Sequence, residues 1–253
     1  MRIAGIQSDL AWEDRDANLA TLAPLVAEAA GGGATLVVLP EMFAVGFSMD
    51  TARIAEAPDG PTSTWLIDQA AAHGVWIGGS VPVLPPGAQR PRNTFVLAGP
   101  AGEQHRYEKR HPFSYAGEHE HYDAGESSLS VDIGGLRTSL TVCYDLRFAD
   151  QYWDVAPATD CYLVVANWPS PRREHWRTLL VARAIENQAF VVGVNRIGVD
   201  GNGLDHAGDS MIVDPLGEVL ADAGSAATVI SAEVDASSVA DVRARLPFLP
   251  DRR

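Results

Sequence analysis

Short apolar runs and helical apolar spacings alternate along the first third of the chain. Residues 2–7 (RIAGIQ) and 36–40 (LVVLP) are short apolar segments typical of buried strands. Between them, apolar side chains recur at helical spacing until a glycine triplet at 31–33 stops the pattern: Leu19, Leu22, Val26 and Ala30. A second helix is expected over 61–74, with a strand over 75–83 (VWIGGSVPV) after it. The pattern predicts a repeated strand and helix order.

The middle of the chain changes to consecutive strands. Gly and Pro punctuation separates four strand candidates, which are TFVLAG, QHRYEK, LSVDIGG and LRTSLTV, and hairpins are therefore expected between residues 94 and 142. The alternation then resumes with a strand at CYLVVAN, a helix over about 174–187 and a strand at FVVGVN. A further hairpin (SMIVD and EVLADA), a strand (TVISAEV) and a polar helix from about residue 236 complete the chain. This order favours an α/β protein with helix-covered sheets.

Composition narrows the class of protein. No stretch resembles a linker, so we expect residues 1–253 to form a single domain. No signal peptide and no run of about 18 apolar residues is present, which predicts a soluble protein with no membrane partner. The only cysteines, Cys143 and Cys161, lie in apolar segments, and this suits the reducing cytoplasm better than a disulfide framework. The formal charge of −14 argues against binding to nucleic acid, which needs clustered Lys and Arg.

Three reactive side chains share one local context. Glu41 follows the strand LVVLP, Lys109 follows QHRYE, and Cys143 follows LRTSLTV. In α/β architectures, residues just past the carboxyl ends of strands collect at one edge of the sheet, where ligands bind. We therefore expect the three side chains to converge.

Each residue type suits one part of amide hydrolysis. Cys143 lies where an apolar strand meets a polar segment, and backbone N–H groups with a nearby cation would favour its thiolate there. Glu41 is flanked by Pro, Met and Phe, which suits a carboxylate that accepts and returns a proton. Lys109 could stabilise a developing oxyanion, and Glu118 could hold its ammonium in place. Taken singly, each has an ordinary alternative as a buried hydrophobe, a capping group or surface charge, and Cys161 keeps the first of these.

A histidine cluster offers a different chemistry. His111, His119 and His121 crowd one segment, and His-x-His can present two metal ligands on one face of a strand. The segment looks like a loop, however, and neither a Cys pair nor an HExxH motif accompanies it. We expect no metal here, and we expect these histidines to position the loop through hydrogen bonds.

Six motifs in order give the chain a family resemblance. LPEMFAVGF, YEKRHPF, GEHEHY, TVCYDLRF, NWPSPR and ARAIENQAFVVGVNRIG resemble the nitrilase superfamily, also called the carbon–nitrogen hydrolases, over essentially the whole chain. The resemblance implies a four-layer α-β-β-α sandwich that forms homodimers or larger homo-oligomers and needs no cofactor. It also implies Cys143 as nucleophile, Glu41 as general base, Lys109 as oxyanion stabiliser with the Tyr144 backbone N–H, and Glu118 as the residue that orients Lys109. The sequence departs from the family at Pro112, where a larger apolar residue is usual.

Within the superfamily, the motifs are most similar to those of ω-amidases, which hydrolyse the terminal amides of 2-oxoglutaramate and 2-oxosuccinamate. CYDLRF lacks the Cys-Trp-Glu of true nitrilases. An N-carbamoyl amino acid hydrolase or a deaminated-glutathione amidase would keep the same triad, and a catalytically silent binding protein or a metal hydrolase would not need it. A panel of amide substrates separates the first two from an ω-amidase. An assay for ammonia release tests the silent binding protein, and full activity in a chelator would exclude the metal hydrolase.

An ω-amidase must also hold the 2-oxo acid end of its small-molecule substrate. A guanidinium suits a carboxylate, and Arg172 and Arg173 follow the strand end at NWPSP. Arg147 competes for this role, although its spacing from Cys143 suits a structural ion pair. We expect aromatic walls from Phe43, Tyr115 and Trp168, with core packing as the alternative.

Overall fold

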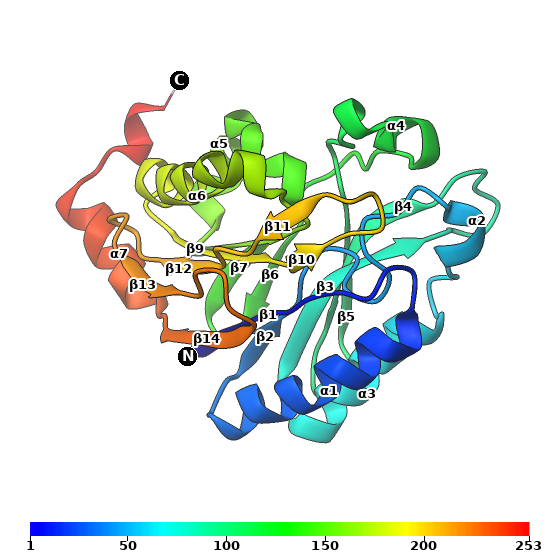
Figure 1. Cartoon of the computed structure of the whole chain (residues 1–253). Helices are drawn as coiled ribbons and strands as arrows, with labels where there is room; N and C mark the ends of the chain where they lie inside the picture. The colour runs from blue at the N-terminus through cyan, green and yellow to red at the C-terminus, as the bar shows by residue number, and fades with distance from the viewer. Residues whose placement is uncertain (253) are drawn as a thin grey trace.

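Two six-stranded mixed sheets form the centre of the molecule in a computed structural model that describes residues 1–252 (Figure 1). The first sheet has the order β14 (Thr228–Glu233), β1 (Arg2–Gln7), β2 (Leu36–Val38), β3 (Trp76–Val83), β4 (Arg92–Ala98) and β5 (Gln104–Glu108). The second has the order β13 (Val219–Asp222), β12 (Met211–Val213), β9 (Phe190–Asn195), β8 (Cys161–Ala166), β7 (Leu136–Val142) and β6 (Ser130–Ile133). In each sheet the three adjacent strands β1 to β3 or β7 to β9 are parallel, so their carboxyl ends lie at one edge.

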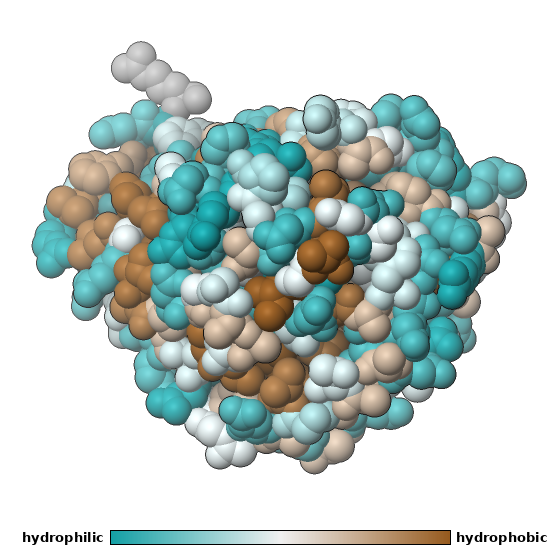
Figure 2. Space-filling model, viewed as in Figure 1, coloured by the Kyte–Doolittle hydropathy of each residue, from teal (hydrophilic) through white to brown (hydrophobic). Residues whose placement is uncertain are grey.

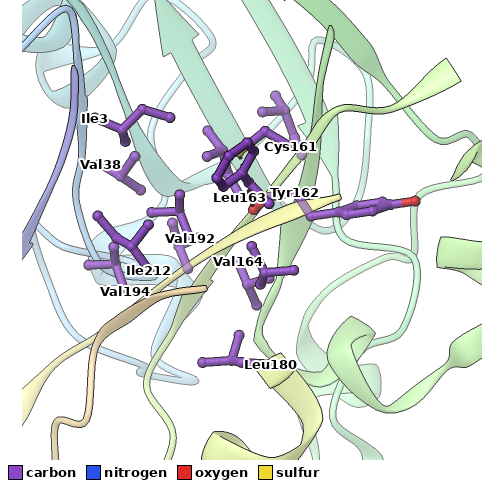
Figure 3. Packing of buried hydrophobic residues seen from close by; sticks show 14 of the residues in the cluster. Ile3, Val38, Cys161, Tyr162, Leu163, Val164, Leu180, Val192, Val194 and Ile212 are labelled. Carbon is purple, nitrogen blue, oxygen red and sulfur yellow. Dashed lines mark hydrogen bonds between the residues drawn. The ribbon is translucent and has the colours of Figure 1, made fainter. Parts of the chain in front are cut away.

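The two sheets pack face to face. Ile3 and Val38 of the first sheet belong to the same buried cluster as Val192, Val194 and Ile212 of the second (Figure 3). At Gly5 the sheets approach so closely that a Cβ would lie 2.8 Å from a methyl group of Val194. The alternation of side chains along β1, β2, β8 and β9 therefore places one apolar face of each strand in a shared core.

Helices cover the two outer faces. The helices α1 (Arg15–Gly31) and α3 (Pro61–His73) bury Leu22, Val26 and Leu66 against the first sheet. The helix α6 (Arg173–Asn187) packs on the second sheet, where a Cβ at Gly193 would lie 2.5 Å from Leu180. The predicted α-β-β-α sandwich is confirmed, with α1 and α3 below the sheets and α5 (Ala149–Val155) and α6 above them in Figure 1.

The strands and long helices lie close to their predicted ranges, and the differences are short elements. The sequence pattern did not predict α2 (Thr51–Ile54), α5 (Ala149–Val155) or the small hairpin of β10 (Ile197–Val199) and β11 (Asp205–Ala207). The segment expected as a loop around GEHEHY contains α4 (Glu118–His121), and the polar C-terminal helix is α7 (Ala236–Arg245). Four to seven residues are too few to show a helical period. None of the helices between residues 1 and 252 is long and apolar enough to cross a membrane.

Candidate active site

The carboxyl ends of the strands bring the predicted reactive residues together. Glu41 lies three residues after β2, and Lys109 and Cys143 directly follow β5 and β7. β5 is antiparallel to β4, which is antiparallel to β3, so β5 runs in the same direction as the parallel strands. Glu41 is fully buried, and Lys109 is 1% and Cys143 8% exposed. The convergence expected from the strand ends is therefore observed.

Lys109 lies between two buried carboxylates. Its Nζ is 3.0 Å from Oε1 of Glu41 and 2.8 Å from Oε2 of Glu118, which is also fully buried. Burial alone would lower the pKa of Lys109, but the charges of Glu118 and Glu41 outweigh it and raise the pKa well above its usual range. Burial raises the pKa of Glu118, and the nearby Lys109 charge opposes this rise. Lys109 is thus a fixed, permanently charged donor.

Two asparagines hold the carboxylates, and neither was among the residues predicted for the site. Asn93 Nδ2 donates to Oε1 of Glu41 at 2.8 Å and to Oε1 of Glu118 at 3.1 Å. The Asn167 backbone N–H donates to Oε2 of Glu41 at 2.8 Å, and its side chain donates to the Glu41 carbonyl. Asn167 follows the strand β8, so the strand-end rule that singled out Cys143 applied to it too. Asn93 lies near the start of β4, where a lone Asn gives no such signal.

Cys143 occupies a strained turn. Its φ is +47°, in the left-handed region that non-glycine residues rarely adopt, and it begins a 3₁₀ turn over Cys143–Arg147. Burial and then the negative charge of Glu41 raise the pKa of its thiol well above the usual value, and Lys109 only partly offsets them. The expectation of a stabilised thiolate is therefore wrong, because burial outweighs the nearby cation. The thiol needs a base when it attacks, and Glu41 is beside it.

The thiol opens into a cavity of about 240 Å³. The lining residues are Phe47, Met49, Phe113, Ala116, Cys143, Tyr144, Arg147, Asn167, Trp168, Pro169, Arg172, Asp200, Asn202, Leu204 and His206. The last four belong to the β10–β11 hairpin and its turn, which the sequence pattern did not predict. The cavity is thus lined by the reactive thiol and by both apolar and polar side chains, as small-molecule sites commonly are.

Two guanidinium groups in the cavity wall have no carboxylate partner among the salt bridges of residues 1–252. The Arg147 guanidinium carbon lies 4.7 Å from the centre of the Trp168 ring. The Arg172 guanidinium carbon lies 5.4 Å from the centre of the Phe113 ring. Burial and then the charge of the nearby Arg172 lower the pKa of Arg147, as expected for two cations that repel each other. The ion pair that we considered for Arg147 is absent from the described structure. An anionic group in the cavity would relieve this repulsion.

Three of the predicted substrate-contacting residues lie outside the cavity lining. Phe43 is fully buried and packs against Trp65, which is the core alternative. Tyr115 is 86% exposed because the 3₁₀ turn that carries it points the ring to solvent. Arg173 forms a 2.9 Å ion pair with the buried Asp209. Trp168 and Arg172 do line the cavity.

The histidines of the middle segment do not converge. His111 contacts Asp145 through its Nδ1 at 2.9 Å, whereas His119 is on the exposed side of α4. Within residues 1–252, no group of three or more His, Cys, Asp or Glu side chains is arranged to hold a metal ion.

A buried thiol beside a carboxylate and an ammonium is an arrangement suited to acyl transfer, and comparisons with known proteins agree with it. The family model for carbon–nitrogen hydrolases matches residues 2–244. Omega-amidase YafV of Escherichia coli (strain K12) is 40% identical over 252 residues, which are 99% of this chain and 96% of that protein. The 2-oxoglutaramate amidase of Bacillus subtilis is 34% identical over 226 residues, covering 87% of this chain and 85% of the relative.

Solved structures give the same result. XC1258 of Xanthomonas campestris, a CN-hydrolase superfamily protein with an arsenic adduct in its active site, has a TM-score of 0.94 and 41% identity over 100% of this chain and 97% of its own. An E41Q mutant of the amidase of Nesterenkonia sp. AN1, in which acrylamide has added to the active-site cysteine, has a TM-score of 0.85 and 28% identity over 98% of both chains. The chain belongs to the carbon–nitrogen hydrolase family. The predictions of this family and of an amide-hydrolysing enzyme are confirmed.

Proposed function

We propose that this enzyme is an ω-amidase that hydrolyses the terminal amide of a small 2-oxo dicarboxylate monoamide, with 2-oxoglutaramate as the test substrate. The observation that carries the proposal is a cavity lined by the Cys143 thiol and by two guanidinium groups without a carboxylate partner, with the Glu41–Lys109–Glu118 cluster buried beside the thiol. The relatives named ω-amidase and 2-oxoglutaramate amidase support it. Ammonia release by the wild type and by variants of the cluster tests it.

In the proposed reaction, Glu41 takes the proton of Cys143 as the sulfur attacks the amide carbon. Lys109 and the Tyr144 backbone N–H hold the oxyanion, and one such donor is commonly worth about 3 kcal/mol. Glu41 then returns the proton to the departing nitrogen, which leaves as ammonia, and a thioester remains on Cys143. A water molecule activated by Glu41 hydrolyses the thioester and releases the acid. These steps use side-chain and backbone groups of the chain and require no metal or organic cofactor.

Glu118 has a supporting role in this proposal. It accepts two contacts from Lys109 Nζ, at 2.8 and 3.1 Å, and one from the Phe113 backbone N–H at 2.5 Å. Asn93 bridges the two carboxylates, which would otherwise repel each other. Glu118 can therefore fix the ammonium while Glu41 remains beside the thiol.

We propose that Arg172, with Arg147 beside it, binds the carboxylate of the 2-oxo acid. Both guanidinium groups stack on aromatic rings of the cavity, which limits their motion before substrate arrives. Asp200 and His206 from the β10–β11 hairpin complete the polar part of the wall. Trp168 contributes an aromatic surface.

Replacing Arg172 with Ala is expected to raise the KM for 2-oxoglutaramate about 10- to 100-fold, because a hydrogen-bonded charge pair is worth about 1.5–3 kcal/mol. The matched control is Arg173→Ala, which removes the neighbouring cation outside the cavity and leaves Asp209 paired with Arg177 at 3.1 Å. Its KM should change less than about 2-fold. Steady-state kinetics on both variants, with a neutral amide of equal length as a second substrate, measure the effect. An Arg172→Ala variant with an unchanged KM would remove the carboxylate role.

The remaining expectations concern the setting of the enzyme. We propose a cytoplasmic, single-domain protein that acts as a homodimer or larger homo-oligomer without a nucleic-acid partner. Apolar residues are exposed near the C-terminal side of the fold, including Ile185 at 50% and Phe248 at 58%. Figure 2 shows apolar surface where Figure 1 places β13 and α7. Sedimentation of the purified protein measures the oligomeric state.

A further inference from the structure

A buried carboxylate outside the reactive cluster joins two parts of the active site. Asp145 is fully buried and accepts four hydrogen bonds. Its Oδ1 accepts from the backbone N–H of His111 at 3.0 Å and contacts His111 Nδ1 at 2.9 Å. Its Oδ2 accepts from the Tyr107 hydroxyl at 2.7 Å and from the Val142 backbone N–H at 3.0 Å. Each oxygen of the carboxylate therefore has two hydrogen-bond partners, and none of these partners is a Lys or an Arg.

These partners flank the reactive residues in sequence. Val142 immediately precedes Cys143, and Tyr107 and His111 lie two residues before and after Lys109. Asp145 thus connects the nucleophile turn to the segment that carries the ammonium. The His111 ring stacks on Phe148 with centroids 3.7 Å apart. Phe148 directly follows the turn over Cys143–Arg147, so His111 also contacts the carboxyl end of that turn.

The strained turn at Cys143 needs such support. A non-glycine residue with φ of +47° costs roughly 1–3 kcal/mol, and this conformation persists only where its surroundings fix it. Burial and the Asp145 charge raise the pKa of Tyr107 well above its usual value, so its hydroxyl keeps its proton and donates. Gln151 Nε2 in turn donates to that hydroxyl at 2.7 Å.

We propose that Asp145 is a positioning residue that sets the Cys143 sulfur relative to Lys109, through Val142 on one side and His111 and Tyr107 on the other. The inference rests on the proposed roles of Cys143 and Lys109. Asp145 itself does not line the cavity, so it acts through these residues and does not contact substrate.

An amide of the same size cannot replace this carboxylate. Asn offers one accepting oxygen and one donating nitrogen, whereas both oxygens of Asp145 face a backbone N–H. Whichever way the amide of an Asp145→Asn variant turns, the N–H of either Val142 or His111 meets a donor and loses its partner. The substitution keeps the volume of the side chain and removes the hydrogen bond to one of these two backbone N–H groups.

The test measures kcat, KM and the rate at which iodoacetamide alkylates Cys143 in the full-length enzyme. We expect Asp145→Asn to lower both kcat and the alkylation rate about 10- to 100-fold, as small misplacements of reacting groups do, with KM within about 2-fold. The matched control is Asp160→Asn, because Asp160 is also a buried, multiply bonded carboxylate but it pairs with Arg137 at the opposite end of β7 and β8. Alkylation of a Cys143→Ala variant gives the background from Cys161.

A second variant keeps the test valid if Asp145→Asn does not fold. His111→Phe retains a ring to stack on Phe148 and removes the Nδ1 contact with Asp145. His111→Phe should also lower kcat and the alkylation rate, by a smaller factor than Asp145→Asn. The proposal is overturned if folded variants alkylate at the wild-type rate, or if Asp160→Asn loses as much as Asp145→Asn. Alkylation needs no amide substrate, so an enzyme that ignores 2-oxoglutaramate would contradict the proposed function and leave this test intact.

Discussion

Replacing Cys143 with Ala is expected to reduce ammonia release from 2-oxoglutaramate by about 10,000-fold or more, because the thioester route needs the sulfur. Cys143 lines the cavity beside Glu41 and Lys109, and an alanine methyl group leaves the buried contact between Glu41 and Lys109 in place. The loss should therefore fall on kcat with little change in thermal stability. Enzyme-coupled detection of ammonia over a range of enzyme concentrations measures it.

The matched control is Cys161→Ala, which removes the other thiol of the chain. Cys161 is fully buried in β8 and does not line the cavity, so it has no access to substrate. Burial and then the Asp160 charge raise the pKa of its thiol. This variant should keep activity within about 3-fold and lose roughly 1 kcal/mol or more of stability, because it leaves a small cavity in the core. A Cys143→Ala enzyme that still releases ammonia would refute the thioester mechanism.

An N-carbamoyl amino acid tested alongside separates the mechanism from the substrate. Both substrate classes carry a carboxylate for Arg172, and both would react through Cys143. Turnover of the carbamoyl compound alone, lost on Cys143→Ala, would keep the proposed chemistry and move the enzyme to another branch of its family.

The reactive cluster could be predicted from sequence because strand ends impose a common edge. Glu41 and Cys143 follow the buried strands β2 and β7, and Lys109 follows the more polar strand β5. A sheet whose strands run in the same direction brings the positions after their carboxyl ends together. Their order and motifs added the family resemblance. The fold was predictable for the same reason, since the long elements carry clear periods.

The substrate end of the site was less predictable because short loops build it. Neighbouring arginines in one polar segment were indistinguishable from sequence, yet Arg172 lines the cavity while Arg173 pairs with Asp209. That difference depends on where α6 begins and on an aspartate 36 residues further along the chain. The hairpin carrying Asp200 and His206 has strands of three residues, too short for a pattern.

The two glutamates that contact Lys109 should respond differently to conversion into glutamine. Glu41→Gln is expected to lower kcat about 1,000-fold or more, because in the proposed mechanism it removes the carboxylate that carries the thiol proton to the leaving nitrogen. Glu118→Gln should cost about 10- to 100-fold, since it weakens only the hold on the ammonium. Both variants keep the shape of the side chain, and steady-state kinetics on 2-oxoglutaramate compare them.

The rate of Cys143 alkylation as a function of pH distinguishes the roles of Glu41 and Glu118 more sharply than turnover alone. Among neighbouring charges, Glu41 contributes most to the raised pKa of the thiol, and Glu118 contributes less. Removing the Glu41 charge should therefore lower this pKa, so that Glu41→Gln reaches half-maximal alkylation at a lower pH than wild type although it hydrolyses amide far more slowly. If Glu41 carries the proton, its loss should therefore lower the pKa of the thiol and also slow amide hydrolysis. If Glu118→Gln showed that combination and Glu41→Gln kept its turnover, the roles of the two carboxylates would be reversed.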